Sequence, residues 1–356
     1  MIERYFDHAA TTPLAPEVAA AIRDAEALYG NPHSLHSAGR AAMAAVENAR
    51  AQVACLLGAE DPAQIVFTSG ATEGNNWILR SFGEGDVGPF EHSSVREPAE
   101  RLGFSVLENE DFHVEPARTP FASHMLVNNE TGTLFDLASI RGSATTFHSD
   151  VTQALGKLPI PLDGIDIATF SAHKLYGPKG IGAVYLKDPT LPLEPLLLGG
   201  AQENGLRAGT LNVPGIVGFG AAAALAQARM EEDFLHAQRL REVLLEEIER
   251  VPEHRVIGGG QVSPYILSLS FHGVQGETVV LEVDREGYAI SSGAACSSRS
   301  TEPSHVLTAL RLPDPWLRGT IRISFGRGNT VESTAGLARA LTRTVANLRM
   351  MLGSAD

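Results

Sequence analysis

A lysine and two polar residues upstream of it have the types and spacing that amine chemistry needs. Lys174 follows an apolar, β-branched stretch that contains Ile165 and Ile167, and a turn-rich Gly-Pro-Lys-Gly segment follows it. Burial at the end of a strand favours a neutral amine, which forms a Schiff base with a carbonyl group. Asp150 and Gln153 lie just upstream, and a pyridinium nitrogen requires such a carboxylate as its partner. The combination predicts a pyridoxal phosphate (PLP) site, although an isolated lysine after a strand is usually exposed.

A second polar segment indicates an anion site. The run Ser-Gly-Ala-Thr-Glu at 69–73 stands where the strand-like stretch 65–68 meets the start of a helix. Amide groups at a helix N-terminus, together with a hydroxyl group, bind phosphate. The alternative is an ordinary helix cap, in which Ser69 or Thr72 accepts hydrogen bonds from the first amides. This segment alone does not distinguish between the two.

One histidine, two segments and one arginine offer further groups for a cofactor or substrate. His92 suits stacking over an aromatic ring or acid–base catalysis, although a lone histidine is more often structural. The run Asn-Asn-Glu-Thr-Gly at 128–132 either holds a substrate or forms a turn. The glycine-rich segment 199–210 carries Arg207 and either reaches an anion or connects two elements. Arg322, on an expected strand, suits a carboxylate ligand or a salt bridge.

The two cysteines are expected to differ in role. Cys296 lies among small and polar residues at 291–300, so its thiol is a candidate nucleophile. Cys55 lies beside Val53 and Leu56 on an expected helix, which predicts a place in the core. Two cysteines cannot build a disulfide framework, and reduced thiols are typical of a cytoplasmic protein. The histidines and cysteines show no metal-ligand spacing, so no metal site is predicted.

The composition is that of a globular protein with more than one core. The chain has 356 residues, of which 44% are hydrophobic and 20% charged, and this length favours two domains. Its net charge of −14 argues against a nucleic acid or an anionic membrane as partner. The N-terminal segment is charged from Glu3, unlike a signal peptide, and the longest apolar stretch, 213–226, is too short to span a bilayer. We therefore predict a cytoplasmic location.

The pattern of elements predicts an α/β domain followed by a smaller α+β domain. Strand and helix signals alternate to about residue 227, which indicates a mostly parallel sheet covered by helices. We expect a large domain at 14–230 that binds the cofactor. We expect residues 1–13 and 231–356 to form the small domain, which carries the Cys296 segment. The expected helices include 16–29, 39–57 and 231–251, and the expected strands include 65–68, 265–271 and 320–325.

Ordered motifs run through nearly the whole chain. They are Tyr5–Pro13, Gly30–Ser34, Thr68–Glu73, Asn128–Gly132, Ser171–Lys174, Leu206–Thr210 and Ser292–Cys296. With these motifs the chain resembles the cysteine desulfurases of the NifS/IscS-like group, which are fold type I PLP enzymes of the class V aminotransferase family. The Ser-Ser-Gly-x-x-Cys segment resembles the IscS/NifS group rather than the SufS-like group. The resemblance implies a large domain with a mostly parallel seven-stranded sheet and a small α+β domain.

The resemblance also implies an activity and its residues. The protein would convert L-cysteine to L-alanine with a persulfide on Cys296, whose thiolate attacks the substrate sulfur. Lys174 would carry PLP as an aldimine and move the substrate Cα proton. Asp150 would keep the pyridine nitrogen protonated, and Gln153 would bond the ring oxygen. His92 would stack on the ring and shuttle protons.

The remaining implied roles concern the phosphate, the substrate and the partners. The other cofactor-binding residues, most of them at the phosphate, are Ala71, Thr72, Ser171 and His173. Thr210 is expected to reach the phosphate in the other subunit of a homodimer. Asn129 and Arg322 would hold the substrate carboxylate. A sulfur-acceptor protein would take the persulfide sulfur for iron–sulfur cluster or thio-cofactor assembly, and neither nucleic acid nor membrane is an expected partner.

The sequence departs from the family pattern in places and leaves alternatives. Ala172 replaces a usual glycine, and the segments 85–126 and 137–148 are shorter than the pattern leads us to expect. One alternative is a selenocysteine lyase or another class V lyase or aminotransferase; Cys296 argues against a plain aminotransferase. Another is a trimmed, non-catalytic interaction protein. The joint presence of Lys174, Asp150 and Cys296 argues against that.

Overall fold

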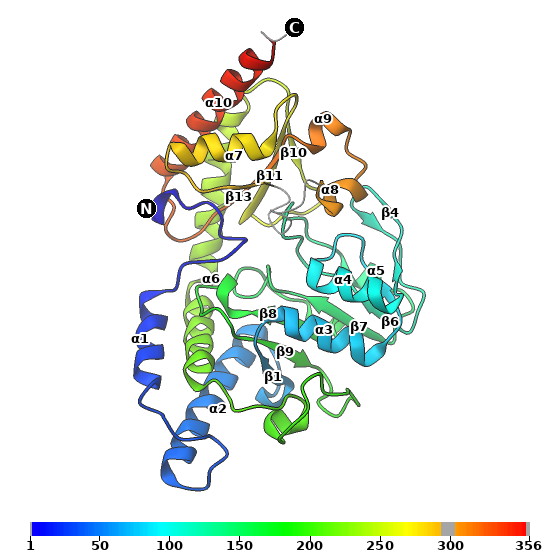
Figure 1. Cartoon of the computed structure of the whole chain (residues 1–356), viewed down its shortest axis with the longest axis vertical. Coiled ribbons are helices and arrows are strands. Elements are labelled where there is room, and N and C mark those ends of the chain that lie inside the picture. Colours follow the sequence, from blue (N-terminus) through cyan, green and yellow to red (C-terminus); the bar gives the residue numbers. More distant parts are fainter. Residues whose placement is uncertain (1, 293–302, 354–356) are drawn as a thin grey trace.

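A computed structural model describes residues 2–292 and 303–353, in which two main sheets with their helices lie one above the other in Figure 1, and β4 and β5 form a small third sheet. The helices are α1 (Pro16–Ala25), α2 (Ser37–Leu57), α3 (Ala71–Phe82), α4 (Ser93–Leu102), α5 (Leu137–Arg141), α6 (Val213–Ile248), α7 (Gly276–Arg285), α8 (His305–Ala309), α9 (Asp314–Leu317) and α10 (Val331–Gly353). The strands are β1 (Ile65–Thr68), β2 (Asp86–Val87), β3 (Ser105–Val106), β4 (Asn109–Glu110), β5 (His113–Val114), β6 (Phe121–Ser123), β7 (Thr146–Asp150), β8 (Ile167–Ser171), β9 (Gly182–Leu186), β10 (His254–Ile257), β11 (Ile266–Phe271), β12 (Ser291–Ser292) and β13 (Thr320–Ser324).

Local sequence signals set the ends of the first helices. α2 begins after His36, whose Nδ1 accepts the Gly39 amide at 3.2 Å, and it ends at Gly58 with a φ of 83°, which favours glycine. The structure confirms the helix expected at 39–57 and the strand at 65–68. α1 ends four residues before the expected position 29, because the chain turns to pack Gly30 directly on the backbone of Ala38.

The larger sheet has seven strands in the order β1-β9-β8-β7-β6-β2-β3. All its neighbours pair in parallel except β9, which is antiparallel to both β1 and β8. The predicted mostly parallel sheet is therefore confirmed. Because β7 and β8 are parallel neighbours, their carboxyl ends meet at one edge of the sheet. Asp150 ends β7 and Ser171 ends β8, three residues before Lys174.

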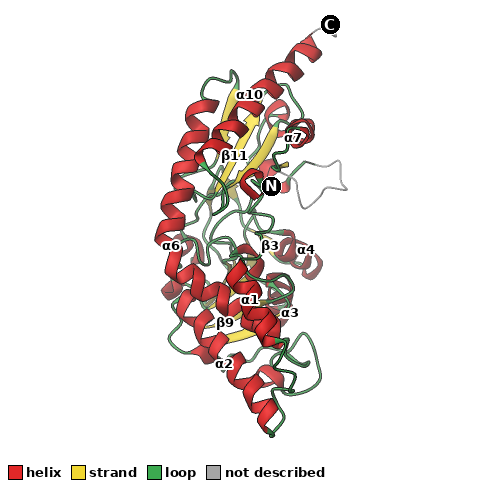
Figure 2. Cartoon of the chain, turned by 90° about the vertical axis from the view of Figure 1, so that its left-hand side faces the viewer, coloured by secondary structure: helices red, strands yellow, loops and turns green. Residues whose placement is uncertain are grey.

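Alternating side chains give this sheet two apolar faces. Phe67 and Phe170 pack in one core with α2 and the first part of α6. Val66, next to Phe67, and Ile167, three residues before Phe170, point to the opposite face and pack in a second core with α3 and α4. Helices thus cover both faces, as Figure 2 shows with α2 and α6 on one side and α3 and α4 on the other. Because both faces are buried, the positions of β7 and β8, which end near Asp150 and Lys174, are held by packing on both sides.

The smaller sheet is antiparallel and has the order β10-β11-β13-β12. α7, α10 and the last part of α6 supply its apolar core. The N-terminal segment joins this core: Phe6 is fully buried in it, Tyr5 pairs with Ala289, and Asp7 pairs with Ser324. This pairing supports our proposal that residues 1–13 belong with the C-terminal part of the chain as a small domain.

The longest helix, α6, corrects one expectation. A separate helix was expected to begin near Glu231, but α6 runs unbroken from Val213 to Ile248 along both sheets (Figures 1 and 2). Its residues up to Ala226 pack in the core of the larger sheet, and those from Ala237 pack in the core of the smaller one. Each half finds apolar partners, so no break is needed between them. Of the helices in the described ranges, none is long and apolar enough to cross a membrane.

A buried ion pair ties the glycine-rich segment 199–210 to α2 and β1. Arg50 on α2 donates to both carboxylate oxygens of Glu203 at 2.8 Å, and Glu203 Oε2 also accepts the amide of Phe67 at 2.7 Å. Glu203 adopts a φ of 47°, a left-handed conformation that is unusual for a residue other than glycine. The ion pair holds this backbone conformation in place.

We expect Glu203→Gln to destabilise the fold by about 3 kcal/mol, because it removes the buried counter-charge of Arg50 and leaves only the exposed Glu47 carboxylate beside its Nε. Denaturant unfolding measures this change. Glu282→Gln is the matched control, since it removes one partner of the exposed ion pair with Arg285 and should cost below about 1 kcal/mol. Equal losses for the two variants would contradict the role assigned to the buried pair.

Candidate active site

A cavity of about 320 Å³ opens at the carboxyl ends of β7 and β8. It lies where ligands bind in parallel α/β sheets. Its lining includes the predicted residues Ala71, Thr72, His92, Asn129, Asp150, Gln153, Ser171, His173, Lys174 and Arg322. The fold therefore gathers residues from 71 to 322 into one site. Sequence reasoning did not name the other lining residues, which are Ala9, Ala10, Ser94, Met125, Val127 and Thr152.

Lys174 is held by the N-terminal segment. It ends the short 3-10 turn η4 (Ala172–Lys174), which follows β8 directly. Its Nζ donates to the carbonyl oxygens of Ala9 and Ala10, each at 2.6 Å. The amide of Thr12 donates to the carbonyl of His173 at 2.9 Å, which holds the two segments side by side. Backbone carbonyl groups thus hold the amine in the lining of the cavity.

Asp150 sits opposite with its carboxylate fixed by two donors. Asn75 Nδ2 donates to Oδ2 at 2.9 Å, and the Thr152 amide donates to Oδ1 at 3.0 Å. Asn75 is oriented in turn by Thr169, whose hydroxyl donates to the Asn75 Oδ1 at 2.5 Å. Asn75 is a positioning residue that sequence reasoning missed. Its signal was a polar side chain on the buried face of α3, where an apolar one is the norm.

The N-terminus of α3 faces the same cavity as an anion site. The first residue before the helix, Gly70, provides no side-chain cap, and neither Ser69 nor Thr72 fills that role. The Ala71 amide donates to Ser171 Oγ at 2.8 Å, which places this hydroxyl beside the helix start. Glu73 is turned away, since it accepts the Ser69 amide and pairs with Arg207 at 2.9 Å. The helix-cap alternative is therefore replaced by an uncapped helix start with two hydroxyl groups near it.

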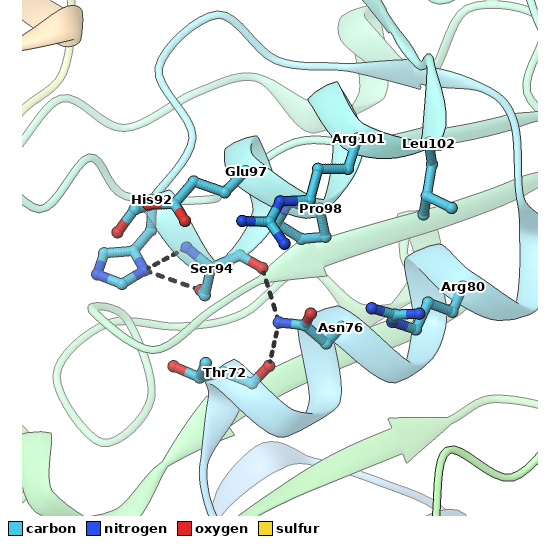
Figure 3. A pocket seen from close by; sticks show the side chains of 10 residues that line it. Thr72, Asn76, Arg80, His92, Ser94, Glu97, Pro98, Arg101 and Leu102 are labelled. Carbon is cyan, nitrogen blue, oxygen red and sulfur yellow. Dashed lines mark hydrogen bonds between the residues drawn. The ribbon is translucent and has the colours of Figure 1, made fainter.

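His92 caps α4 and presents an ordered imidazole. Its Nδ1 accepts the Ser94 amide at 3.1 Å and lies 2.8 Å from Ser94 Oγ, as Figure 3 shows. Burial lowers the pKa of His92, although the Asp150 carboxylate opposes the shift. A neutral ring that accepts at Nδ1 carries its proton on Nε2. His92 is therefore held in one tautomer.

His173 is also kept neutral. Its Nδ1 lies 3.1 Å from the hydroxyl of Thr11. Burial and the positive charges of Lys174, Lys179 and Lys157 lower its pKa to about 4. A neutral imidazole at this position can donate or accept one hydrogen bond without adding charge to the cavity.

Arg322, on β13, brings a cation from the smaller sheet into the cavity. Its Nη2 donates to Asp7 Oδ1 and its Nη1 donates to the Asn129 carbonyl, both at 2.9 Å. Its Nε is buried and has no hydrogen-bond partner among the described residues. A carboxylate ligand is the kind of group that a guanidinium with an open donor recognises. Asn129 lines the cavity beside it.

Two predicted site residues are not among the lining residues of this cavity. Thr210 is exposed and does not line this cavity. Cys296 falls in the segment 293–302, outside the described residues. Cys55, which was expected in the core, is exposed. The core expectation was wrong because Val53, Ala54, Leu56 and Leu57 turn inward on α2, which leaves Cys55 on the outer face of the helix.

A second hollow of about 470 Å³ adjoins the site between α3 and α4, and Figure 3 shows its side chains. It shares Thr72, His92 and Ser94 with the first cavity. Arg80 and Arg101 line its outer part. The end of the site at Thr72 is thus bordered by a second hollow rather than by a closed wall.

A known protein family matches most of the chain. The Aminotransferase class-V family model matches residues 4–336. The chain belongs to this family. The cysteine desulfurase IscS of Dictyoglomus turgidum is 38% identical over 98% of this chain and 95% of its own length. The cysteine desulfurase IscS of Shewanella loihica is 40% identical over 98% of this chain and 94% of its own length. The mitochondrial cysteine desulfurase of Saccharomyces cerevisiae is 39% identical over 97% of this chain and 75% of its own length.

Solved structures agree with the fold. A NifS-like protein superposes with a TM-score of 0.87 at 32% identity and covers 97% of this chain and 100% of its own. A NifS-like protein from Rickettsia africae gives a TM-score of 0.88 at 29% identity and covers 97% of this chain and 99% of its own. The predicted membership of the NifS/IscS-like group and the fold type I architecture are therefore confirmed.

A buried carboxyl next to Asn129 gives the folding stability a pH dependence. Glu130 follows Asn129, and its Oε2 accepts the Ser304 hydroxyl at 2.6 Å. Burial raises its pKa from an ordinary value of 4.5 to about 7, although Ser304 and Arg322 oppose the shift. Between these two pH values the folded protein holds a proton that the unfolded chain releases. Folding stability therefore falls as pH rises through this window.

We expect Glu130→Gln to gain stability relative to the wild type by roughly 3 kcal/mol between pH 4.5 and 8, because the amide does not ionise. Denaturant unfolding at several pH values measures the difference between the two proteins. Glu110→Gln, at an exposed position on β4, serves as the control and should show no such trend. A difference that stays constant with pH for Glu130→Gln would show that this carboxyl does not titrate in the window.

Proposed function

We propose that this protein is a PLP-dependent cysteine desulfurase that converts L-cysteine to L-alanine and leaves a persulfide on Cys296. One observation carries the proposal: a single cavity presents an amine, a fixed carboxylate, an ordered imidazole, an uncapped helix start and a guanidinium. Relatives that match nearly the whole chain bear the name cysteine desulfurase. The persulfide sulfur would supply iron–sulfur cluster or thio-cofactor assembly through an acceptor protein that is still unidentified.

The donor set fits PLP group by group. The Lys174 amine suits the aldehyde, the Asp150 carboxylate suits the protonated ring nitrogen, and His92 offers a face for the ring. The start of α3 with Thr72 and Ser171 suits the phosphate. When bound, the cofactor supplies a ring that withdraws electrons from the substrate Cα, and the protein supplies binding, orientation and proton transfer.

The protein's own groups divide the remaining work. The Ala9 and Ala10 carbonyls aim the Lys174 amine, which takes and returns the proton at the substrate Cα. Arg322 and Asn129 hold the substrate carboxylate, which fixes the direction of the Cα–H bond. The Cys296 thiolate then bonds to the substrate sulfur. The electron pair of the broken carbon–sulfur bond stays on carbon, which takes up a proton and leaves as alanine.

Oligomeric state and location are part of the proposal. Thr210 is exposed and lies away from its own cavity, which suits a role at the phosphate end of a second subunit in a homodimer. The opening between α3 and α4 beside Thr72 is wide enough to admit such a group. A cytoplasmic location stays a prediction from the presence of only two cysteines.

We expect the purified protein to form alanine from L-cysteine and to gain one sulfur atom on Cys296, measured by amino-acid analysis and intact mass. Cys296→Ala should keep the absorbance of bound PLP but release no sulfide, because the nucleophile is lost. Lys174→Ala should lose both the lysine-bound absorbance and alanine formation. Sulfide release by Cys296→Ala at the wild-type rate would refute the nucleophile assignment, and turnover of L-selenocysteine alone would redefine the substrate.

Mixed dimers test the role of Thr210. We expect Thr210→Ala to weaken PLP binding and Lys174→Ala to be inactive. A mixed dimer of the two variants would keep one complete site, formed by Lys174 of one subunit and Thr210 of the other. Random exchange of subunits should therefore restore activity to about a quarter of all sites. Activity that never exceeds the sum of the separate variants would place Thr210 outside the partner's site.

A further inference from the structure

A buried lysine outside the cavity contacts one of its walls. Lys157 lies in the turn between β7 and η3 (Leu162–Gly164), is 8% exposed and does not line the cavity itself. Its Nζ donates to Gln153 Oε1 at 3.4 Å and lies 5.8 Å from the centre of the Tyr265 ring. Burial of an amine is costly unless it has such partners. The burial of Lys157 beside Gln153 therefore needs a physical explanation.

Lys157 decides the orientation of the Gln153 amide. An ammonium group only donates hydrogen bonds, so it must face the amide oxygen of Gln153 rather than its NH₂ group. Nε2 then donates to the carbonyl oxygen of Ala9 at 3.0 Å. A reversed amide would set NH₂ against the ammonium and oxygen against the carbonyl, and both hydrogen bonds would be lost. Gln153 and Ala9 line the cavity, so the end of the amide beside Ala9 carries donor hydrogens.

We propose that Lys157 is a positioning residue that keeps the NH₂ group of Gln153 toward the cavity, where it donates to the ring oxygen of bound PLP. The inference rests on the proposed function, since it concerns the same cofactor. It also connects Lys157, in the protein interior, to the Lys174 amine through a series of hydrogen bonds. Lys157 holds Gln153, Gln153 donates to the Ala9 carbonyl, and this carbonyl also accepts from Lys174 Nζ at 2.6 Å.

The surroundings of Lys157 keep it in place. Gly156 has a φ of 71°, and a Cβ on it would come within 2.9 Å of Ala226 Cβ on α6, so the turn packs tightly against that helix. The amide of Lys157 donates to the Ala154 carbonyl at 2.9 Å. The backbone of Lys157 is therefore held in place, with its Nζ at Gln153.

The charged and titratable groups around Lys157 come from several elements. With it they line a cavity of about 20 Å³, enough for one water molecule: His8 from the N-terminal segment, Tyr176 after η4, Asp233 on α6, Tyr265 before β11 and Arg327 after β13. Burial, followed by the charge of Lys174, lowers the pKa of Lys157 to about 7. Burial also keeps His8 neutral by lowering its pKa to about 3. Lys157 thus donates to Gln153 as an ammonium at or below neutral pH, and more weakly as an amine above it.

Substitution of Lys157 by methionine tests the proposal, because methionine keeps the apolar stem and removes the donor. PLP is bound to the intact protein, and the absorbance of the lysine-bound cofactor is titrated with pH. A hydrogen bond to the ring oxygen stabilises its negative charge, so loss of the donor should raise the titration midpoint by about one pH unit. Lys179→Met is the control. It removes an exposed lysine near His173 and should leave the midpoint unchanged.

A double substitution separates positioning from simple charge. In a Gln153→Leu background, Lys157→Met should cause no further shift, because Lys157 acts through Gln153. A midpoint in Lys157→Met equal to that of the wild type would overturn the proposal. A shift that persists undiminished in the Gln153→Leu background would do so as well, since it would show direct action of the charge. Lys157→Leu repeats the test if the methionine variant does not fold.

The apo protein gives an independent readout. The nitrogen-15 signal of the Gln153 side-chain amide, identified by its loss in Gln153→Leu, should move in Lys157→Met and stay in place in Lys179→Met. An unmoved signal in Lys157→Met would refute the orientation. Failure of the protein to bind PLP at Lys174 would overturn the proposed function, and the apo measurement would still decide the role of Lys157.

Discussion

The carbonyl oxygen of Ala9 is the point on which the site depends. It accepts hydrogen bonds from Lys174 and from Gln153, while the amide of the same residue donates to Ser324 on the smaller sheet. Two residues earlier, Asp7 pairs with Arg322. The turn at residues 7–10 thus connects Lys174 and Gln153, which follow strands of the larger sheet, to β13 of the smaller sheet. Because these groups are buried, losing any one partner would leave a donor or acceptor unsatisfied, and this penalty fixes the segment in one position.

Desolvation sets the charges of the cavity. Burial lowers the pKa of His92, of His173 and of His148, a neighbour of Asp150, so these rings are neutral near pH 7. The charged groups that remain are those with a chemical task, and each is paired or hydrogen-bonded: Asp150 with Asn75, and Arg322 with Asp7. A low-dielectric site with few but well-oriented charges favours electrostatic catalysis, because the groups need no reorganisation during the reaction.

Much of this could be predicted from local sequence. The motifs around Lys174 and Asp150 indicated the chemistry, and the alternation of strands and helices indicated the sheet, because both signals are short-range. The extent of α6 could not be predicted from the sequence. Its two halves have separate apolar patterns, and only the structure shows that one continuous helix packs them in two different cores. Cys55 was misplaced because neighbouring apolar residues suggested burial, whereas the rotation of α2 on the sheet decides which face turns outward.

The sequence by itself determined the residue types of the site, the helix and strand signals and the family. The chemistry of a side chain depends only on its residue type. The spacing of apolar residues indicates whether the segment that contains them is a helix or a strand. Only the tertiary structure decided that Asn75 fixes Asp150, that Ala9 receives Lys174 and Gln153, and that Lys157 orients Gln153. These contacts join positions far apart in the chain or depend on burial. Their energies arise when the two cores close around them and exclude water.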